Sequence, residues 1–213
     1  MKNTVELIGT YGDDLTHACS AWTSTGRSLS DDKKKRVGKM LETLAVNGHM
    51  TPFEKSSIHF LVTTDIATHI HLLKHRIGVS VNAESPRYKE IKTDKFIIPE
   101  DWPSKWATEL KNYTREGLDL YHTCVSELQE YGLSRSRAKE SARFFRTYNT
   151  QITSDVMFNW RSFAHFLKLR KSEHSQLEIR VLAEEMLSLI SDTGLFPHTI
   201  HAMESANFIE KIN

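Results

Sequence analysis

Apolar residues recur at every third or fourth position through much of the second half of the chain, which is the spacing of amphipathic helices. The longest such stretch covers residues 101–131 and ends at Gly132, and a more basic helix follows over residues 134–145. Further helices are predicted over residues 159–170 and 174–192.

The first half carries shorter signals. Asp13 and Asp14 indicate the start of one helix, and a second is predicted over residues 28–48. Asp65 is expected to cap a third helix.

Short β-leaning or alternating runs predict strands at residues 5–11, 58–63, 96–98 and 148–158. Because strands and long helices are mixed without a regular βαβ alternation, the pattern favours an α+β fold. Residues 1–213 suit a single domain, with a helical extension at about residues 101–145 within it.

The composition is that of a folded globular protein, with 39% hydrophobic and 26% charged residues. The formal net charge of +1 argues against a protein that coats nucleic acid, although it permits a local basic pocket for a small anion. Two distant cysteines, Cys19 and Cys124, stand in no metal or redox spacing, which favours a reducing compartment. Since no apolar run approaches the ~20 residues of a membrane span, a cytoplasmic protein is expected.

Residues 71–88 form the segment richest in basic and polar side chains that could bind a ligand. Basic side chains bracket a polar run of Ser, Asn and Glu, and one Gly and one Pro bend the backbone. Arg and Lys donate to phosphate and carbonyl oxygens, while Ser, Asn and Glu can read a planar polar ring. The segment is therefore a candidate nucleotide-binding site.

Other chemistries find less support in the sequence. No Gly-rich phosphate loop and no Gly-x-Ser-x-Gly elbow is present. His71 and His75 are four residues apart, but no Glu follows His71, so the zinc-protease motif is incomplete. A zinc hydrolase at this pair remains an alternative, although no metal site is expected.

A second cluster lies at residues 159–178. On a helix, Arg161 and His165 are neighbours one turn apart, and Arg170 and His174 fall near the break before the last long helix. Taken alone, the cluster would suit an amphipathic helix with exposed cations.

Together with the loop at residues 49–54, these segments resemble the flavin-dependent thymidylate synthase family. The resemblance covers about residues 5 to 195. The segments that carry it are His49-Met50-Thr51-Pro52-Phe53-Glu54, Lys74-His75-Arg76 through Ser85-Pro86-Arg87-Tyr88, Asn159-Trp160-Arg161-Ser162, Leu169-Arg170 and His174-Ser175-Gln176-Leu177-Glu178.

The resemblance implies a central, mostly antiparallel sheet flanked by long helices, in a homotetramer whose active sites lie at subunit interfaces. It also implies conversion of dUMP to dTMP with FAD, NADPH and 5,10-methylenetetrahydrofolate. The implied flavin-contacting residues are Thr51, Lys74, His75, Arg76, Asn159, Arg161 and His165. The implied nucleotide-contacting residues are His71, Lys74, Glu84, Ser85, Pro86, Arg87, Arg143 and Arg170.

The implied catalytic residue is Arg170, whose fixed charge would favour ionisation at N3 of the uracil ring. The residues agree with such a route, because neither cysteine sits in a polar motif that would supply a thiolate nucleophile. Ser85, Arg87 and Arg143 suit phosphate anchoring by charge-assisted hydrogen bonds. Ser85 as a direct nucleophile and Arg143 as a plain surface cation are the alternatives.

The sequence departs from the family pattern at four positions. Lys74 replaces an Arg, Ala83 stands at the signature Glu with Glu84 one place later, and His71 and His165 replace the usual Gln and Asn. These changes leave open a relative that acts on UMP or transfers a different one-carbon group. A nucleotide-binding homologue that has lost catalysis is a further alternative.

Overall fold

The computed structural model describes residues 2–26, 28–85 and 95–209, and their contacts divide into two compact units. The helical unit, as we call it, comprises Met1–Thr4, Thr63–His71 and Asn82–Ser154. The α7 unit comprises Val5–Val62, Leu72–Val81 and Asp155–Asn213. That the whole chain is one domain stays a prediction. Within the described ranges, no helix is both long and apolar enough to cross a membrane.

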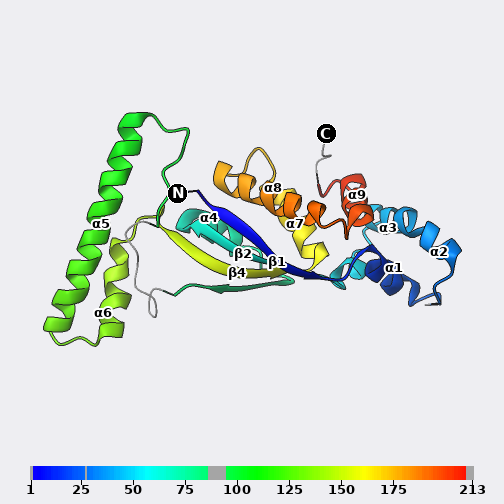
Figure 1. The fold of residues 1–213 in the computed structure, drawn as a ribbon, viewed down its shortest axis with the longest axis horizontal. Coiled ribbons are helices and arrows are strands. Elements are labelled where there is room, and N and C mark those ends of the chain that lie inside the picture. Colours follow the sequence, from blue (N-terminus) through cyan, green and yellow to red (C-terminus); the bar gives the residue numbers. More distant parts are fainter. Residues whose placement is uncertain (1, 27, 86–94, 210–213) are drawn as a thin grey trace. The chain divides into compact units, whose positions relative to one another are not determined.

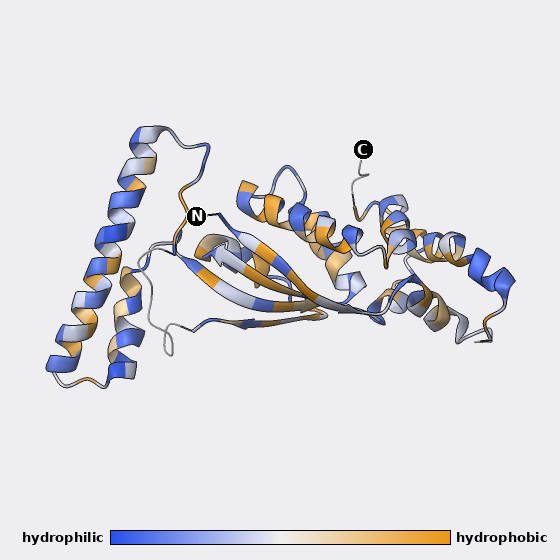
Figure 2. Cartoon of the chain, in the orientation of Figure 1, coloured by the Kyte–Doolittle hydropathy of each residue, from blue (hydrophilic) through white to orange (hydrophobic). Residues whose placement is uncertain are grey.

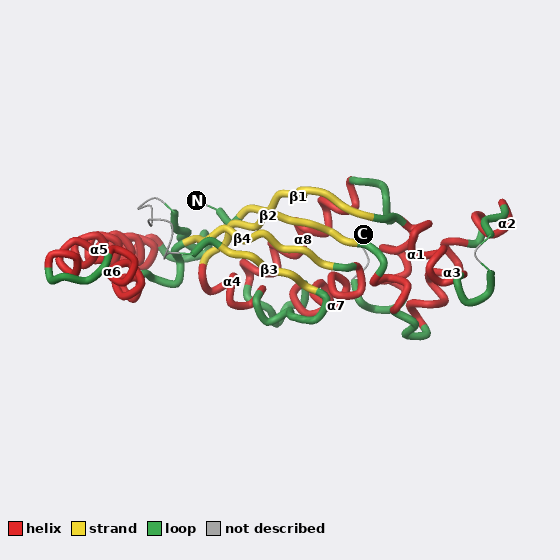
Figure 3. Tube along the Cα trace, turned by 90° about the horizontal axis from the view of Figure 1, so that it is seen from below, coloured by secondary structure: helices red, strands yellow, loops and turns green. Residues whose placement is uncertain are grey.

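A four-stranded antiparallel sheet is formed by the described residues, in the order β1-β2-β4-β3 (Figure 3). The side chains of Ile58, Phe60 and Val62 are fully buried, as expected from the alternation in this strand. The predicted α+β class with an antiparallel sheet is confirmed. The strands are β1 (Thr4–Tyr11), β2 (Ser57–Asp65), β3 (Val79–Ala83) and β4 (Gln151–Phe158).

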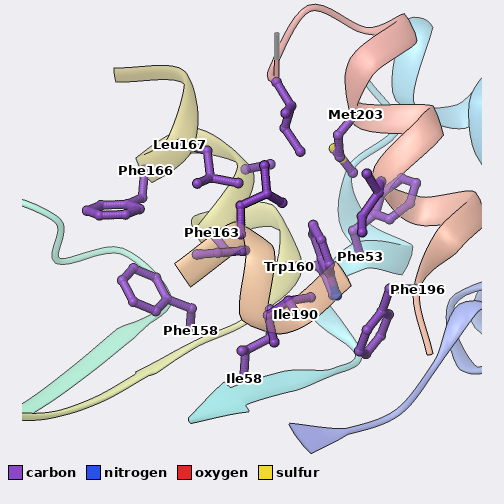
Figure 4. Close-up of a cluster of buried hydrophobic side chains, with 14 of the residues drawn as sticks. Phe53, Ile58, Phe158, Trp160, Phe163, Phe166, Leu167, Ile190, Phe196 and Met203 are labelled. Carbon is purple, nitrogen blue, oxygen red and sulfur yellow. The ribbon is translucent and has the colours of Figure 1, made fainter. Parts of the chain in front are cut away.

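The α7 unit holds most of the short helices around one apolar core (Figure 4). Phe163 lies at its centre, with its ring 5.5 Å from Trp160 and 5.8 Å from Phe60. The helices of this unit are α1 (Asp14–Trp22), α2 (Asp31–Lys35), α3 (Val37–Val46), the 3₁₀ turn η1 (Thr51–Glu54), α7 (Trp160–Arg170), α8 (Leu177–Asp192) and α9 (Pro197–Ser205).

The helical unit contains α4 (Ile66–Leu72, of which Leu72 belongs to the α7 unit), α5 (Ser104–Glu130), α6 (Arg135–Ala142) and the 3₁₀ turn η2 (Arg143–Phe145). Helices α5 and α6 lie side by side (Figure 1), and α5 is mostly hydrophilic (Figure 2). A Cβ at Gly117 would lie 2.6 Å from the carbonyl oxygen of Phe145, so glycine lets η2 approach α5 closely. Helices α5 and α6 thus form a hairpin within the helical unit.

Several local predictions needed correction. The helix predicted over residues 28–48 breaks at Arg36, where α2 ends and α3 begins. The strand predicted at residues 96–98 is a single bridge between Phe96 and Thr150.

Asp65 caps α4 as expected, since its Oδ1 accepts a hydrogen bond from the Thr68 N–H at 2.9 Å.

Candidate functional site

Helix α7 carries the polar groups of the candidate site on one side and core residues on the other. Asn159 caps the helix, since its Oδ1 accepts the Ser162 N–H at 2.9 Å. Phe163 and Phe166 are fully buried, whereas Arg161 and His165 are exposed. The predicted i, i+4 pairing of Arg161 and His165 follows from this helical geometry.

A hollow of about 470 Å³ opens beside the start of α7. We call it the α7 hollow, and its volume falls in the range of small-molecule pockets. Every residue that lines it belongs to the α7 unit. The lining residues are Met50, Glu54, Ile77, Gly78, Asn159, Arg161, Ser162, His165 and Phe208.

Three of the predicted flavin-contacting residues, Asn159, Arg161 and His165, line the α7 hollow. The other predicted flavin contacts, Thr51, Lys74, His75 and Arg76, belong to the same unit without lining it. Thr51 begins η1, and Glu54 at the other end of that turn does reach the hollow. Glu54 Oε1 accepts a hydrogen bond from Arg161 Nη1 at 2.6 Å, so the loop and α7 are joined by an ion pair.

At the far end of α7, Arg170 meets His75. The Nε–H of Arg170 donates to Nε2 of His75 at 2.9 Å. The imidazole ring is buried and packs edge-on against Phe166, with a ring centroid distance of 5.0 Å. Burial, and then the nearby Arg170 and His165, lower the pKa of His75 to about 4.

His75 is therefore neutral near pH 7 and carries its proton on Nδ1, because Nε2 accepts the bond from Arg170. Burial also lowers the pKa of Arg170. A guanidinium titrates so far above neutral pH that it stays cationic at neutral pH. The structure thus holds the predicted catalytic cation against a neutral ring.

The predicted nucleotide contacts are divided between the units. Lys74 and Arg170 lie in the α7 unit, while His71, Glu84, Ser85 and Arg143 lie in the helical unit. Pro86 and Arg87, together with Tyr88, lie outside the described residues. Arg143 is exposed at the start of η2.

Glu84 is already engaged inside the helical unit. Its Oε2 accepts the Thr153 N–H at 3.2 Å, and its Oε1 lies 3.8 Å from Lys95 Nζ. Glu84 also raises the pKa of Arg146, which burial lowers more strongly. Arg146 donates from Nη2 to the Gln151 carbonyl at 2.9 Å. The sequence reasoning missed this half-buried cation, because a basic residue after a helix gives no signal of burial.

Other members of the site also escaped the sequence reasoning. Ile77 and Gly78 lie inside the segment 71–88 that the sequence singled out, but neither was assigned a contact. Phe208 lies beyond every motif, and no sequence signal places it at the hollow. Among the described residues, no group of three or more His, Cys, Asp or Glu side chains is arranged to hold a metal ion.

Comparison with known proteins shows the family to which the chain belongs. The family model described as thymidylate synthase complementing protein matches residues 6–197. The chain belongs to this family. Among curated relatives, the flavin-dependent thymidylate synthase of Thermotoga neapolitana is 31% identical over 189 residues, which cover 85% of this chain and 82% of that protein. The enzyme of the same name from Gluconobacter oxydans is 27% identical and covers 94% of this chain and 69% of its own length.

Among solved structures, the UMP/dUMP methylase PolB from Streptomyces cacaoi, bound with 5-Br dUMP, is similar over 99% of this chain and 98% of its own. The TM-score is 0.77 and the identity 25%. The same methylase bound with 5-Br UMP gives a TM-score of 0.74 at 24% identity. The chain is thus an enzyme of a methyltransferase family whose curated members are named for flavin dependence and thymidylate synthesis.

Proposed function

We propose that this thymidylate synthase family member methylates dUMP reductively to dTMP. FAD would be the bound cofactor, with NADPH and 5,10-methylenetetrahydrofolate as co-substrates. The observation that carries the proposal is the α7 hollow, where Asn159, Arg161 and His165 line one cavity. These residues come from the motif that resembles the family's flavin site.

The residues around the hollow fit a flavin. Met50, Ile77 and Phe208 offer apolar surface for a planar ring system, while Asn159 and Arg161 offer an amide and a cation for polar edges and phosphates. Bound flavin would supply the reducing electron pair that turns a one-carbon unit into a methyl group. Overall, methyl replaces the C5 hydrogen of uracil, methylenetetrahydrofolate becomes tetrahydrofolate, and NADPH together with one proton is consumed to give NADP⁺.

The chain's own part is electrostatic. Arg170, oriented through its Nε–H by neutral His75, would present a fixed positive charge to the uracil ring and favour ionisation at N3. Cys19 and Cys124 are half-buried, and neither sits in a polar motif that would supply a thiolate to add to C6.

We also propose which residues contact the nucleotide. His71, Lys74, Glu84, Ser85 and Arg143 would contact the nucleotide, with phosphate anchored by Ser85 and Arg143. Arg87 would anchor the phosphate together with these two residues, and Pro86 would contact the nucleotide. We also propose a cytoplasmic homotetramer whose active sites lie at subunit interfaces.

A second candidate substrate is UMP. The structural relative PolB is named a UMP/dUMP methylase, and its bound forms carry either 5-Br UMP or 5-Br dUMP. The departures at Lys74 and Ala83 fall in the segment predicted to contact the nucleotide. A family member with this segment could accept a ribose as well as a deoxyribose.

Flavin loading and NADPH oxidation test the proposal. The purified protein should be yellow or should bind added FAD, and NADPH oxidation should accelerate when dUMP is added. A colourless protein that fails to bind FAD contradicts the proposal. If UMP but not dUMP accelerates NADPH oxidation, UMP rather than dUMP is the substrate.

A further inference from the structure

A turn at Ile77 and Gly78 is fastened to the first turn of α7. The Ser162 hydroxyl donates to the Ile77 carbonyl oxygen at 2.8 Å. The Asn159 N–H donates to the Gly78 carbonyl oxygen at 3.3 Å. Ser162 is only 8% exposed whereas Ile77 is 92% exposed, so the bond between them is partly buried.

Gly78 is the residue that makes the close approach possible. Its φ of +67° lies in the left-handed region, which residues with a Cβ adopt at a cost. A Cβ at this position would overlap the Ser162 hydroxyl and lie 2.6 Å from Asn159 Nδ2. The turn and the helix start are therefore complementary in shape as well as hydrogen-bonded.

The Ser162 hydroxyl is not needed to cap α7. The backbone N–H of Ser162 already donates to Asn159 Oδ1 at 2.9 Å. The hydroxyl also lies 2.9 Å from that oxygen, but it has one proton to donate. The bond to the Ile77 carbonyl oxygen is therefore the contact that the hydroxyl adds between the helix start and the turn.

The two fastened segments carry the predicted flavin contacts. The turn directly follows His75 and Arg76, and the helix start bears Asn159 and Arg161. Ile77, Gly78 and Ser162 all line the α7 hollow. We propose that Ser162 is a positioning residue that, with Gly78, holds these two segments in register for flavin binding. The flavin part of this inference rests on the proposed function.

The first experiment compares Ser162→Ala with the wild type in FAD titrations. Loss of a partly buried hydrogen bond that orders a binding wall should raise the FAD dissociation constant about tenfold. The cap of α7 should survive, so the far-ultraviolet circular dichroism should not change. Ser24→Ala is the matched control, since Ser24 Oγ also donates to a backbone carbonyl, that of Ala21 at 3.0 Å, but does not line the hollow. FAD affinity in Ser162→Ala equal to that of the wild type would overturn the positioning role.

The second experiment needs no flavin. Melting temperatures are measured for apo wild type, Gly78→Ala, Ser162→Ala and the double variant. Removal of the Ser162 hydroxyl relieves one clash of the new Cβ, so the double variant should melt higher than the sum of the two single shifts predicts. Additive shifts would mean that the two residues do not act together.

The two experiments separate the two proposals. Failure of the wild type to bind FAD would sink the proposed function, while the coupling between Gly78 and Ser162 would still be decided by the melting temperatures. Normal FAD binding by the wild type with additive shifts and unchanged affinity in Ser162→Ala would sink the positioning role alone.

Discussion

The guanidinium of Arg170 is tied to the ring of His75 by an Nε–H···Nε2 hydrogen bond of 2.9 Å. The bond joins the end of α7 to the segment that follows α4, and it requires a neutral imidazole. Burial and two neighbouring cationic or imidazole groups supply that condition by lowering the pKa of His75 to about 4. A fixed cation held by a neutral partner is the arrangement that electrostatic activation of a uracil needs.

Replacement of Arg170 by Ala should leave the fold and FAD binding intact but lower turnover by roughly 100-fold or more, since a preorganised charge is lost. Stopped-flow or steady-state product formation at saturating FAD measures this. Arg170→Lys is the matched control. It keeps the charge but loses the planar fork and the Nε–H, so its turnover should fall between the other two. Turnover in Arg170→Ala equal to that of the wild type would reject the assigned role.

His75→Phe should keep the packing against Phe166 but remove the acceptor for Arg170. Because hydrogen bonds to charged groups contribute about 1.5–3 kcal/mol, turnover at saturating FAD should fall roughly tenfold or more. His165→Phe is the comparison, since the His165 ring lies 6.1 Å from that of His75 and lines the α7 hollow. It should weaken FAD binding more than it lowers turnover. The same split between binding and turnover in both variants would contradict separate roles for the two rings.

The ion pair between Arg161 and Glu54 is expected to matter little for stability. Both side chains are substantially exposed, at 55% and 33%, and exposed pairs contribute about 0–1 kcal/mol. Glu54→Gln should therefore change the free energy of unfolding by less than about 1 kcal/mol in urea titrations. Arg161→Ala should be similarly stable but bind FAD more weakly, because it removes a cation from the hollow. A large loss of stability in either variant would show that the pair is structural.

A buried hydrogen-bond chain surrounds His17. Thr199 Oγ1 donates to Asp14 Oδ1 at 2.6 Å, so its proton is used there. His17 must then donate from Nδ1 to Thr199 Oγ1 at 2.9 Å and accept at Nε2 from Ser56 Oγ at 2.8 Å. Burial lowers the pKa of His17 to about 4, against an opposing influence of Asp13. The ring is therefore held neutral inside the fold.

Because the buried His17 ring is held neutral, we predict that the free energy of unfolding falls in acid. As pH drops from about 6.5 to about 4, an unfolded His17 takes up a proton that the folded protein resists. The free energy of unfolding should therefore decrease with falling pH, by an amount on the order of 3 kcal/mol from this residue. Melting temperatures between pH 7 and pH 5 check the sign.

His17→Gln should be less stable at pH 7 but should show a shallower decline with falling pH. His69 and His75 also have lowered pKa values, so part of the slope should remain. An unchanged slope in His17→Gln would contradict the assignment.

The helix predicted at residues 159–170 buries an apolar face that includes Phe163 and Phe166. The helix predicted at residues 101–131 also formed, although Trp106 and Tyr113 of its apolar repeat are exposed. Strand β3 (Val79–Ala83) was missed, since its polar residues Ser80 and Asn82 carry no strong strand signal. Helix α9 was missed as well, although Pro197 at its first position is a recognisable start.

The candidate site was only partly predictable. The resemblance to the family pointed to Asn159, Arg161 and His165, which the fold brings to one hollow. The sequence could not reveal that Ser162 fastens the turn at Gly78, because that contact joins residues far apart in the chain. Burial of Arg146 likewise depends on tertiary packing rather than on any local pattern.

The identity of the methylated nucleotide tests the proposed reaction. The protein is incubated with FAD, NADPH and 5,10-methylenetetrahydrofolate, together with either dUMP or UMP, and the nucleotide is analysed by mass spectrometry. We expect that dUMP gains a methyl group in place of the C5 hydrogen, and that the gain requires both NADPH and the folate. Recovery of unchanged dUMP and UMP from FAD-loaded protein would contradict it.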